Sequence, residues 1–241
     1  MRSRLRWLLA ASLFAASLIV RAASLDVTPT RVDLTPIDNR QVIELHNNDS
    51  SPVLMEVQSF LWTQEDDGQD LLSPTEELLA VPPIFTVPPN DTQTIRLGFR
   101  APPDVSSEQS YRLILTQVPN EAELSDGIAV LLRLSLPVFY TPRDAEARPE
   151  WSVSIDSVLD TLEVRMTNNG TANQQIRRIF VMSPDRPDEV LAATEGARYV
   201  LAGSTVYWGI PLGRSISADE ITIVTETDRG EIQYVLSVDP Q

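Results

Sequence analysis

The chain of 241 residues contains no cysteine and no lysine, and it has only one histidine and nine glycines. Without cysteine no disulfide can form, so the fold must be stabilised by hydrophobic cores of its own. A single histidine leaves a zinc site to carboxylates, which is rare in proteins. The few glycines form no phosphate-binding loop. These absences argue against a zinc enzyme and against a nucleotide-binding enzyme.

Acidic residues far outnumber basic ones. The chain has 34 aspartates and glutamates against 19 arginines, for a net charge of −15. A chain this acidic repels the phosphates of nucleic acids and the headgroups of anionic lipids. We therefore expect neither a nucleic acid nor an anionic membrane surface among its partners.

The N-terminus has the pattern of an export signal. Arg2, Arg4 and Arg6 precede an uncharged, mostly apolar run over 7–20, which is shorter than the roughly 20 residues that a membrane-spanning helix needs. Small residues follow, so we expect a signal peptide over 1–22 and no membrane insertion after its removal. Removal takes away four arginines and no acid, and the remaining fifteen arginines and 34 acids give a charge of −19.

The rest of the chain has the pattern of short β-strands. Runs rich in valine, isoleucine, leucine, threonine and tyrosine recur about every ten residues, separated by proline, asparagine, aspartate and glycine. These runs cover 41–45, 53–62, 92–99, 111–118, 128–140, 151–155, 161–167, 175–181, 205–210, 220–226 and 231–238. Asn169 followed by Gly170 is typical of a tight turn between two of them.

A segment rich in charge and proline, 141–150, divides these strands into two sets of similar size. Each set has the number and length of strands that an immunoglobulin-like sandwich needs. We predict an all-β protein with two immunoglobulin-like β-sandwich domains, 23–142 and 151–241, joined by a linker over 143–150.

No residue is predicted to be catalytic, and no metal or cofactor is expected. The single histidine, His46, is not accompanied by a serine in a nucleophile elbow. The densest acidic cluster, 65–70, has two interpretations. It is either a solvated hairpin tip, which we favour, or a calcium site, although its spacing departs from the twelve-residue calcium loop.

The run over 128–136 is the most apolar strand of the chain. Side chains alternate across a strand, so five large aliphatic residues share one face: Ile128, Val130, Leu132, Leu134 and Leu136. From the pattern alone, this strand either faces the core of a sandwich or forms a sheet edge that a partner covers. An exposed edge this apolar would otherwise aggregate.

Four motifs in order resemble the periplasmic pilus chaperones of the chaperone–usher pathway (PapD-like). The first strand of that family is similar to 24–34, its proline-rich run to 81–97, its acidic–aromatic strand to 107–119, and its subunit-binding strand to 132–142. The resemblance covers nearly the whole chain after the signal peptide. It implies two immunoglobulin-like domains set at an angle, with a cleft between them.

In this family two basic residues in the cleft grip the terminal carboxylate of the bound subunit. Arg31 matches the first of them. The position of the second, a lysine in the best-known members, falls on Pro137. Arg133 lies on the same face of the strand, four residues earlier, and is expected to replace it. This departure implies a divergent branch of the family.

The resemblance also assigns the apolar strand and the contacts between the domains. Four side chains are expected to fill the groove of an incomplete subunit, namely Ile128, Val130, Leu132 and Leu134. The interdomain ion network of the family maps to Glu108 and Asp228. Its central arginine falls on Thr141, and Arg143 is expected to compensate.

The expected function is therefore a periplasmic chaperone that stabilises pilus or surface-fibre subunits by strand donation and delivers them to an outer-membrane usher. Self-association of the free protein is a further expectation. Two alternatives stay open from the sequence. One is a secreted β-sandwich fibre subunit, and the other is a carbohydrate- or calcium-binding module that uses 65–70. None of these classes is an enzyme.

Overall fold

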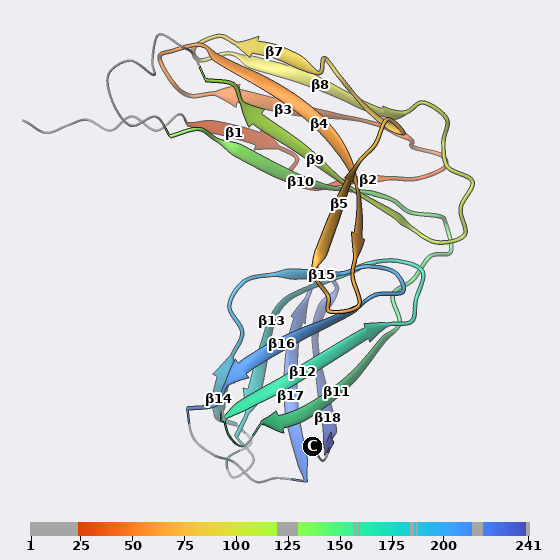
Figure 1. Cartoon of the computed structure of the whole chain (residues 1–241), viewed down its shortest axis with the longest axis vertical. Coiled ribbons are helices and arrows are strands. Elements are labelled where there is room, and N and C mark those ends of the chain that lie inside the picture. The colour runs from red at the N-terminus through yellow and green to blue at the C-terminus, as the bar shows by residue number, and fades with distance from the viewer. Residues whose placement is uncertain are drawn as a thin grey trace, which may run out of the picture.

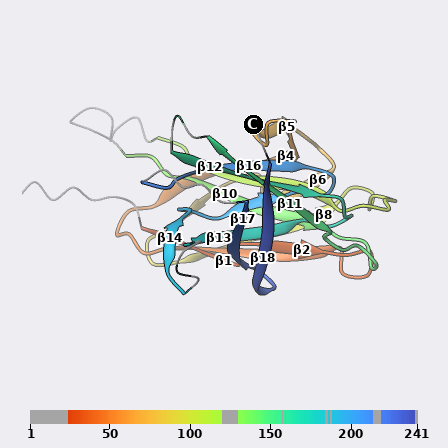
Figure 2. The same ribbon diagram turned by 90° about the horizontal axis from the view of Figure 1, so that it is seen from below.

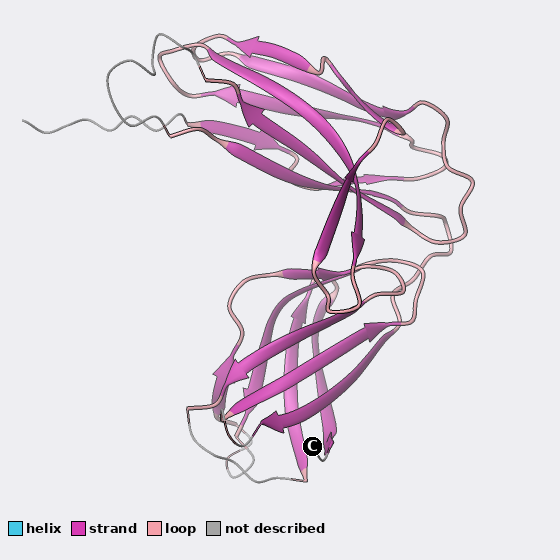
Figure 3. Ribbon diagram, viewed as in Figure 1, coloured by secondary structure: helices cyan, strands magenta, loops and turns pink. Residues whose placement is uncertain are grey.

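The computed structural model describes residues 24–119, 130–156, 158, 160–183, 186, 188–213 and 219–239. The predicted signal peptide and Ile128 lie outside these residues. The described chain forms eighteen strands and no helix, so it offers no helix that is long and apolar enough to cross a membrane (Figure 3). The strands build two domains that are set at an angle to one another (Figure 1). An all-β fold of two immunoglobulin-like sandwiches is thus confirmed.

The first domain packs two sheets face to face. Its ten strands are β1 (Leu25–Thr28), β2 (Val32–Leu34), β3 (Arg40–Asn47), β4 (Val53–Gln64), β5 (Asp70–Pro74), β6 (Leu78–Val81), β7 (Ile84–Val87), β8 (Thr92–Phe99), β9 (Gln109–Gln117) and β10 (Arg133–Tyr140). One sheet has the order β1-β3-β8-β6. The other has the order β2-β10-β9-β4-β5, and β7 also pairs with β4.

Alternation along the strands produces the core between these sheets. In β4, Val53, Met55 and Val57 are buried, whereas the side chains between them face solvent. β8 contributes Ile95 and Leu97 from the opposite sheet in the same way. Both sheets therefore present one apolar face, and the domain folds around a single hydrophobic core.

β10 lies near the edge of its sheet and is only partly covered. It pairs antiparallel with β9 along its whole length. On its other side it meets β2, in parallel, only at Val138, Phe139 and Tyr140. Among the described strands, none pairs with the outer edge of 133–137. The backbone of this stretch is therefore free to pair with another strand.

The strand that was predicted to begin at 128 begins at Arg133. Just before it, Leu132 still follows β9. The amide of Gln117 donates to the Leu132 carbonyl at 2.8 Å, and the Leu132 amide donates to Oε1 of Gln117 at 3.2 Å. The side chain of Gln117 thus accepts the hydrogen bond that a backbone carbonyl would accept in a regular ladder. This explains why the regular strand starts later than the apolar pattern.

The second domain is also a sandwich. Its strands are β11 (Pro149–Asp156), β12 (Thr161–Asn168), β13 (Gln174–Met182), β14 (Val190–Ala193), β15 (Arg198–Val200), β16 (Thr205–Pro211), β17 (Glu220–Thr227) and β18 (Gly230–Asp239). β11, β12 and β16 form one layer, and β13 pairs with β14, β15 and β17 in the other. β18 pairs with β17 and joins the layers through two residue pairs with β11. Seen from below, β18 lies in front of the first domain and overlaps it only in projection (Figure 2).

The connection between the domains covers 141–148 and is held by the loop after β12. Asn169 and Gly170 do not form a hairpin, because β12 and β13 pair with other strands. Instead the loop lies along the connection, where the Thr171 amide donates to the Glu146 carbonyl at 2.7 Å. A Cβ atom on Gly170 would lie 2.5 Å from the Arg148 nitrogen and against the Glu146 carbonyl. Glycine is therefore required here by close approach of two backbones.

We predict that Gly170→Ala lowers the free energy of unfolding of the second domain by about 1–3 kcal/mol, because the added methyl group displaces the interdomain connection. Urea denaturation followed by tryptophan fluorescence measures this change. Gly209→Ala is the control, since a Cβ atom there meets only a methyl group of Thr161 at 3.6 Å. Equal stability of the two variants would contradict the prediction.

Candidate functional site

Three aromatic rings pack together where the two domains meet. Trp62 comes from β4, Phe139 from β10 and Tyr199 from β15 of the second domain. The ring centroids lie 5.9 Å apart for Trp62 and Phe139, 5.5 Å for Trp62 and Tyr199, and 5.3 Å for Phe139 and Tyr199. Trp62 and Phe139 are fully buried, and Leu201 completes the cluster. Aromatic pairs of this kind contribute about 0.5–1.5 kcal/mol each beyond their buried area.

Arg31, on the segment between β1 and β2, is one of two cations at this cluster. Its Nε donates to both carboxylate oxygens of Asp33 at 2.9 and 3.0 Å, and its Nη1 lies 3.5 Å from Asp228. The guanidinium carbon lies 4.6 Å from the centroid of Phe139 and 5.7 Å from that of Tyr199. Burial alone lowers the pKa of Arg31, but the hydrogen bond to Asp33 and the neighbouring negative groups outweigh it and raise the pKa.

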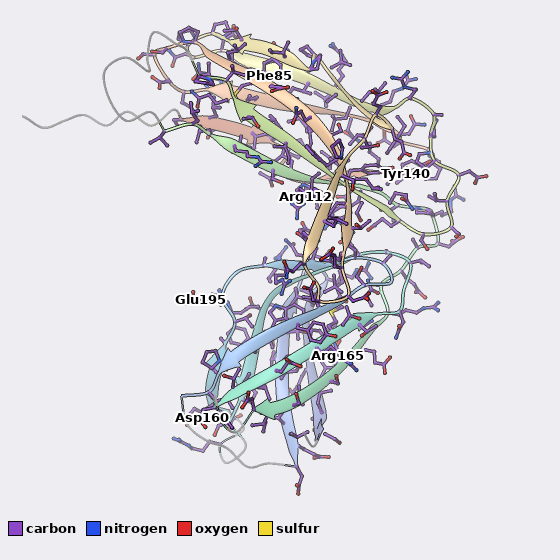
Figure 4. All side chains as sticks on the ribbon, in the orientation of Figure 1. Phe85, Arg112, Tyr140, Asp160, Arg165 and Glu195 are labelled. Carbon is purple, nitrogen blue, oxygen red and sulfur yellow. The ribbon has the colours of Figure 1, made fainter. Side chains whose placement is uncertain are left out.

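Arg112, on β9, is the second cation (Figure 4 labels it where the domains meet). Its guanidinium carbon lies 3.7 Å from the ring centroid of Trp62 and 5.9 Å from that of Tyr199. Its side chain is only 17% exposed, and the nearest carboxylate oxygen, of Asp70, is 3.9 Å away. Burial lowers the pKa of Arg112, against the opposing charge of Asp70. In the β9–β10 ladder Arg112 lies directly opposite Pro137.

Both guanidinium groups therefore contact one ring of the second domain, Tyr199. Cation–π contacts at partly desolvated sites contribute roughly 0.5–2 kcal/mol each. Because Arg31 and Arg112 belong to the first domain and Tyr199 to the second, the position of each cation depends on how the domains meet. An anion at the joint would encounter two arginines in a chain that is otherwise strongly acidic.

The long hairpin of β4 and β5 reaches from the first domain to the second. Gln64 donates to the Tyr199 carbonyl at 2.9 Å and accepts from the Leu201 amide at 3.0 Å. At the tip, Arg198 donates to the Gly68 carbonyl at 2.8 Å. The acidic cluster 65–70 is thus a hairpin tip, with carboxylates that face solvent and a backbone that docks on the second domain. Among the described residues, no group of three or more metal-ligating side chains is placed to hold an ion.

Glu108 forms the most buried polar contact between the domains. Its Oε1 accepts from the amide and the side chain of Asn173 at 2.9 and 2.6 Å. Its Oε2 accepts from the hydroxyl of Thr141 at 2.7 Å. Thr141, where the resemblance expects the central arginine of the network, therefore supplies a neutral donor. Asp228 lies elsewhere, against Arg31, and Arg143 is exposed and has no hydrogen bond or ion pair with a described residue.

The remaining predicted site residues lie on or just before β10. Leu132 and Leu134 are half-buried, and Leu134 packs against the core of the first domain. Val130 is 54% exposed, and Ile128 lies outside the described residues. Arg133 is exposed and pairs with the far end of β9. It lies six positions before Phe139, which is about 20 Å along a strand, so Arg133 lies far from Arg31.

Arg112 was missed by the sequence-based prediction. Its local sequence is an ordinary strand pattern, and nothing in that pattern distinguishes it from a surface arginine. Only the pairing of β9 with β10, which sets Arg112 opposite Pro137, brings it to the joint. His46, in contrast, stands out in the sequence as the single histidine but lies outside this joint. Its Nδ1 is 2.9 Å from the Thr92 hydroxyl, on the surface of a sheet.

The fold and this joint define a two-domain immunoglobulin-like protein with two arginines at the domain junction and an open strand beside them. Residues 24–146 match the family described as pili and flagellar-assembly chaperone, PapD N-terminal domain, and the chain belongs to this family. It is 29% identical over 152 residues to the chaperone protein FimB/FhaD of Bordetella pertussis. That match covers 58% of this chain and 60% of the relative, so it spans less than two thirds of the relative's length.

Solved structures show the same fold over most of the chain. One is a chain of the CsuC–CsuE chaperone–tip adhesion subunit pre-assembly complex of Acinetobacter baumannii, with 19% identity and a TM-score of 0.66. The alignment covers 90% of this chain and all of that one. Another is from the complex of the SafA pilin with the SafB chaperone of Salmonella enterica, with 16% identity, a TM-score of 0.62 and coverage of 90% and 98%.

We predict that Gly68→Ala undocks the tip of the β4–β5 hairpin. A Cβ atom there would lie 2.9 Å from both the Thr205 carbonyl and the Val206 Cα. Limited proteolysis should cut faster within 65–70, and the radius of gyration from solution scattering should increase. Gly203→Ala is the matched control, since Gly203 has nearly the same positive φ, +74° against +76°, but open space around it. If both variants are cleaved and expand alike, backbone strain alone causes the change, and the prediction that the hairpin tip undocks is wrong.

Proposed function

We propose that the protein is a periplasmic chaperone that holds a subunit of a pilus or surface fibre by adding β10 to the subunit's incomplete sheet. The observation that carries this proposal is the free outer edge of 133–137, which lies beside two arginines at the domain joint. A strand added to such an edge gains main-chain hydrogen bonds, and alternate side chains provide the specificity.

The groove of the subunit would be filled by the apolar face of this segment. Ile128, Val130, Leu132 and Leu134 alternate on that face, as the sequence pattern predicts. Complete burial of an exposed side chain of this kind is worth about 1.5–3 kcal/mol, and Leu132 and Leu134 gain less because they are already half-buried. Part of that gain is offset by the freedom that both partners lose on association.

Arg31 and Arg112 would bind the terminal carboxylate of the subunit. We propose Arg112 in the role that the sequence predicted for Arg133, because Arg112 lies opposite Pro137 and shares Tyr199 with Arg31. Charge-assisted hydrogen bonds to a carboxylate contribute about 1.5–3 kcal/mol each when they are shielded from water. The anchor would also set the register, since a slip of one residue turns the apolar face away from the groove.

The remaining assignments follow from membership of the family. The signal peptide over 1–22 would export the chain, and the domains would extend over 23–142 and 151–241. We propose Glu108 as the polar contact that holds the domains at their angle and Asp228 as a weaker interdomain contact to Arg31, while the contribution of Arg143 stays a prediction. Delivery to an outer-membrane usher, a non-enzymatic mode of action and self-association of the free protein belong to the same proposal. The fibre-subunit and the carbohydrate- or calcium-binding alternatives are not favoured.

We predict that Leu132→Asp weakens subunit capture by roughly 100-fold or more, because it places a charge in an apolar groove. The mature protein, tagged and co-expressed with candidate subunits in a periplasm, is purified, and the co-purified subunit is quantified. Leu131→Asp is the control on the opposite face of the segment, where the side chain is already 45% exposed. Equal capture by the parent and both variants would contradict strand donation.

We predict that Arg112→Gln weakens subunit capture about tenfold or more, whereas Arg133→Gln changes it by less than about twofold. Both substitutions remove one positive charge from neighbouring strands, and they differ in that Arg112 is buried at the joint whereas Arg133 is exposed. The dissociation constants of the purified complexes measure the effect, and thermal melting of the free variants checks that both are folded. A larger loss in Arg133→Gln would restore Arg133 as the second anchor.

A further inference from the structure

Two carboxylates contact Arg31, and they do so unequally. Asp33 belongs to the same strand region as Arg31 and lies two residues further along the chain. Asp228 belongs to the second domain and follows the end of β17. The difference between the two contacts suggests that these carboxylates have different functions.

Asp33 holds one edge of the guanidinium group. Nε of Arg31 donates to both oxygens of Asp33, at 2.9 and 3.0 Å, and Nη2 lies 2.8 Å from Oδ1. Such a paired contact fixes the plane of the group as well as its position. The terminal nitrogen Nη1 is left to face the joint, on the side of Asp228.

Asp228 makes a much weaker contact with that remaining nitrogen. Its Oδ2 lies 3.5 Å from Nη1, at the limit of a hydrogen bond. Its Oδ1 is buried and has no hydrogen-bond partner among the described residues. A buried carboxylate oxygen without a partner is unfavourable, so Asp228 is poorly accommodated in the free protein.

We propose that Asp33 is a positioning residue that presents Arg31, and that Asp228 is a placeholder that occupies Arg31 until a carboxylate of the guest displaces it. This inference rests on the proposed function and adds to it. A guest carboxylate that binds Nη1 must come close to Asp228, and two like charges that share one cation repel each other. Asp228 therefore weakens capture, whereas Asp33 strengthens it.

The two carboxylates are thus expected to have opposite effects when each is neutralised without a change of shape. Asp33→Asn loosens Arg31 and reduces the preference for a free carboxylate. Asp228→Asn removes the competitor and increases this preference. A purely structural role of both residues predicts the same sign for both variants.

Two synthetic peptides of alternating valine and threonine test this. They differ only at the C-terminus, which is a free carboxylate in one and a carboxamide in the other. Fluorescence anisotropy with the mature protein gives the ratio of their dissociation constants. We expect the carboxylate preference to fall roughly three- to tenfold in Asp33→Asn and to rise by a similar factor in Asp228→Asn. The control is Glu44→Gln, an exposed β3 side chain of the same charge, which should leave the ratio unchanged.

A fall or no change of the ratio in Asp228→Asn would overturn the placeholder role, even if peptides bind. Failure of the wild-type protein to bind either peptide would instead contradict strand donation. In that case the free protein still tests the positioning role, through hydrogen exchange of the Arg31 Nε–H measured by NMR. Faster exchange in Asp33→Asn than in Asp228→Asn supports it, and the reverse order overturns it.

Discussion

The rest of the structure depends on the packing of Tyr199 against the first domain. The ring packs against the rings of Trp62 and Phe139. Its centroid lies within 6 Å of the guanidinium carbons of Arg31 and Arg112. It therefore combines hydrophobic burial with the attraction of two cations to an aromatic face. Neither arginine would be desolvated to this extent if the domains were separate. The two partly buried positive charges therefore depend on contact between the two domains.

Two further contacts keep that ring in place. In the β4–β5 hairpin, Gln64 binds the Tyr199 carbonyl and the Leu201 amide, and the Gly68 carbonyl at the tip accepts from the side chain of Arg198. On the other side of the joint, Glu108 accepts hydrogen bonds from Asn173 and Thr141. Because these partners are neutral, the joint is held by hydrogen bonds and packing more than by ion pairs.

Much of the fold follows from the sequence pattern, and the site follows less completely. Alternation over 128–136 predicted that Leu132, Leu134 and Leu136 share one face, and the first-strand motif singled out Arg31. Arg112 could not be predicted, because its position depends on the β9–β10 register and on a ring from the other domain. The carboxylates of the acidic tip face solvent as predicted, but a sequence does not show that the Gly68 backbone docks against Val206. Local patterns determine strands and faces, whereas contacts between distant strands determine the site.

The short parallel pairing of β2 with β10 has a geometric consequence. Because β2 covers the edge at Val138, Phe139 and Tyr140, a guest strand that pairs with the free edge is stopped at 137. Arg31 stands immediately before β2, at the point where the free edge ends. The free edge of β10 thus ends where β2 begins to pair with it, and the positive charge of Arg31 lies at the same place. Under the proposed function, this one boundary would select the end of a guest strand both by its position and by its terminal charge.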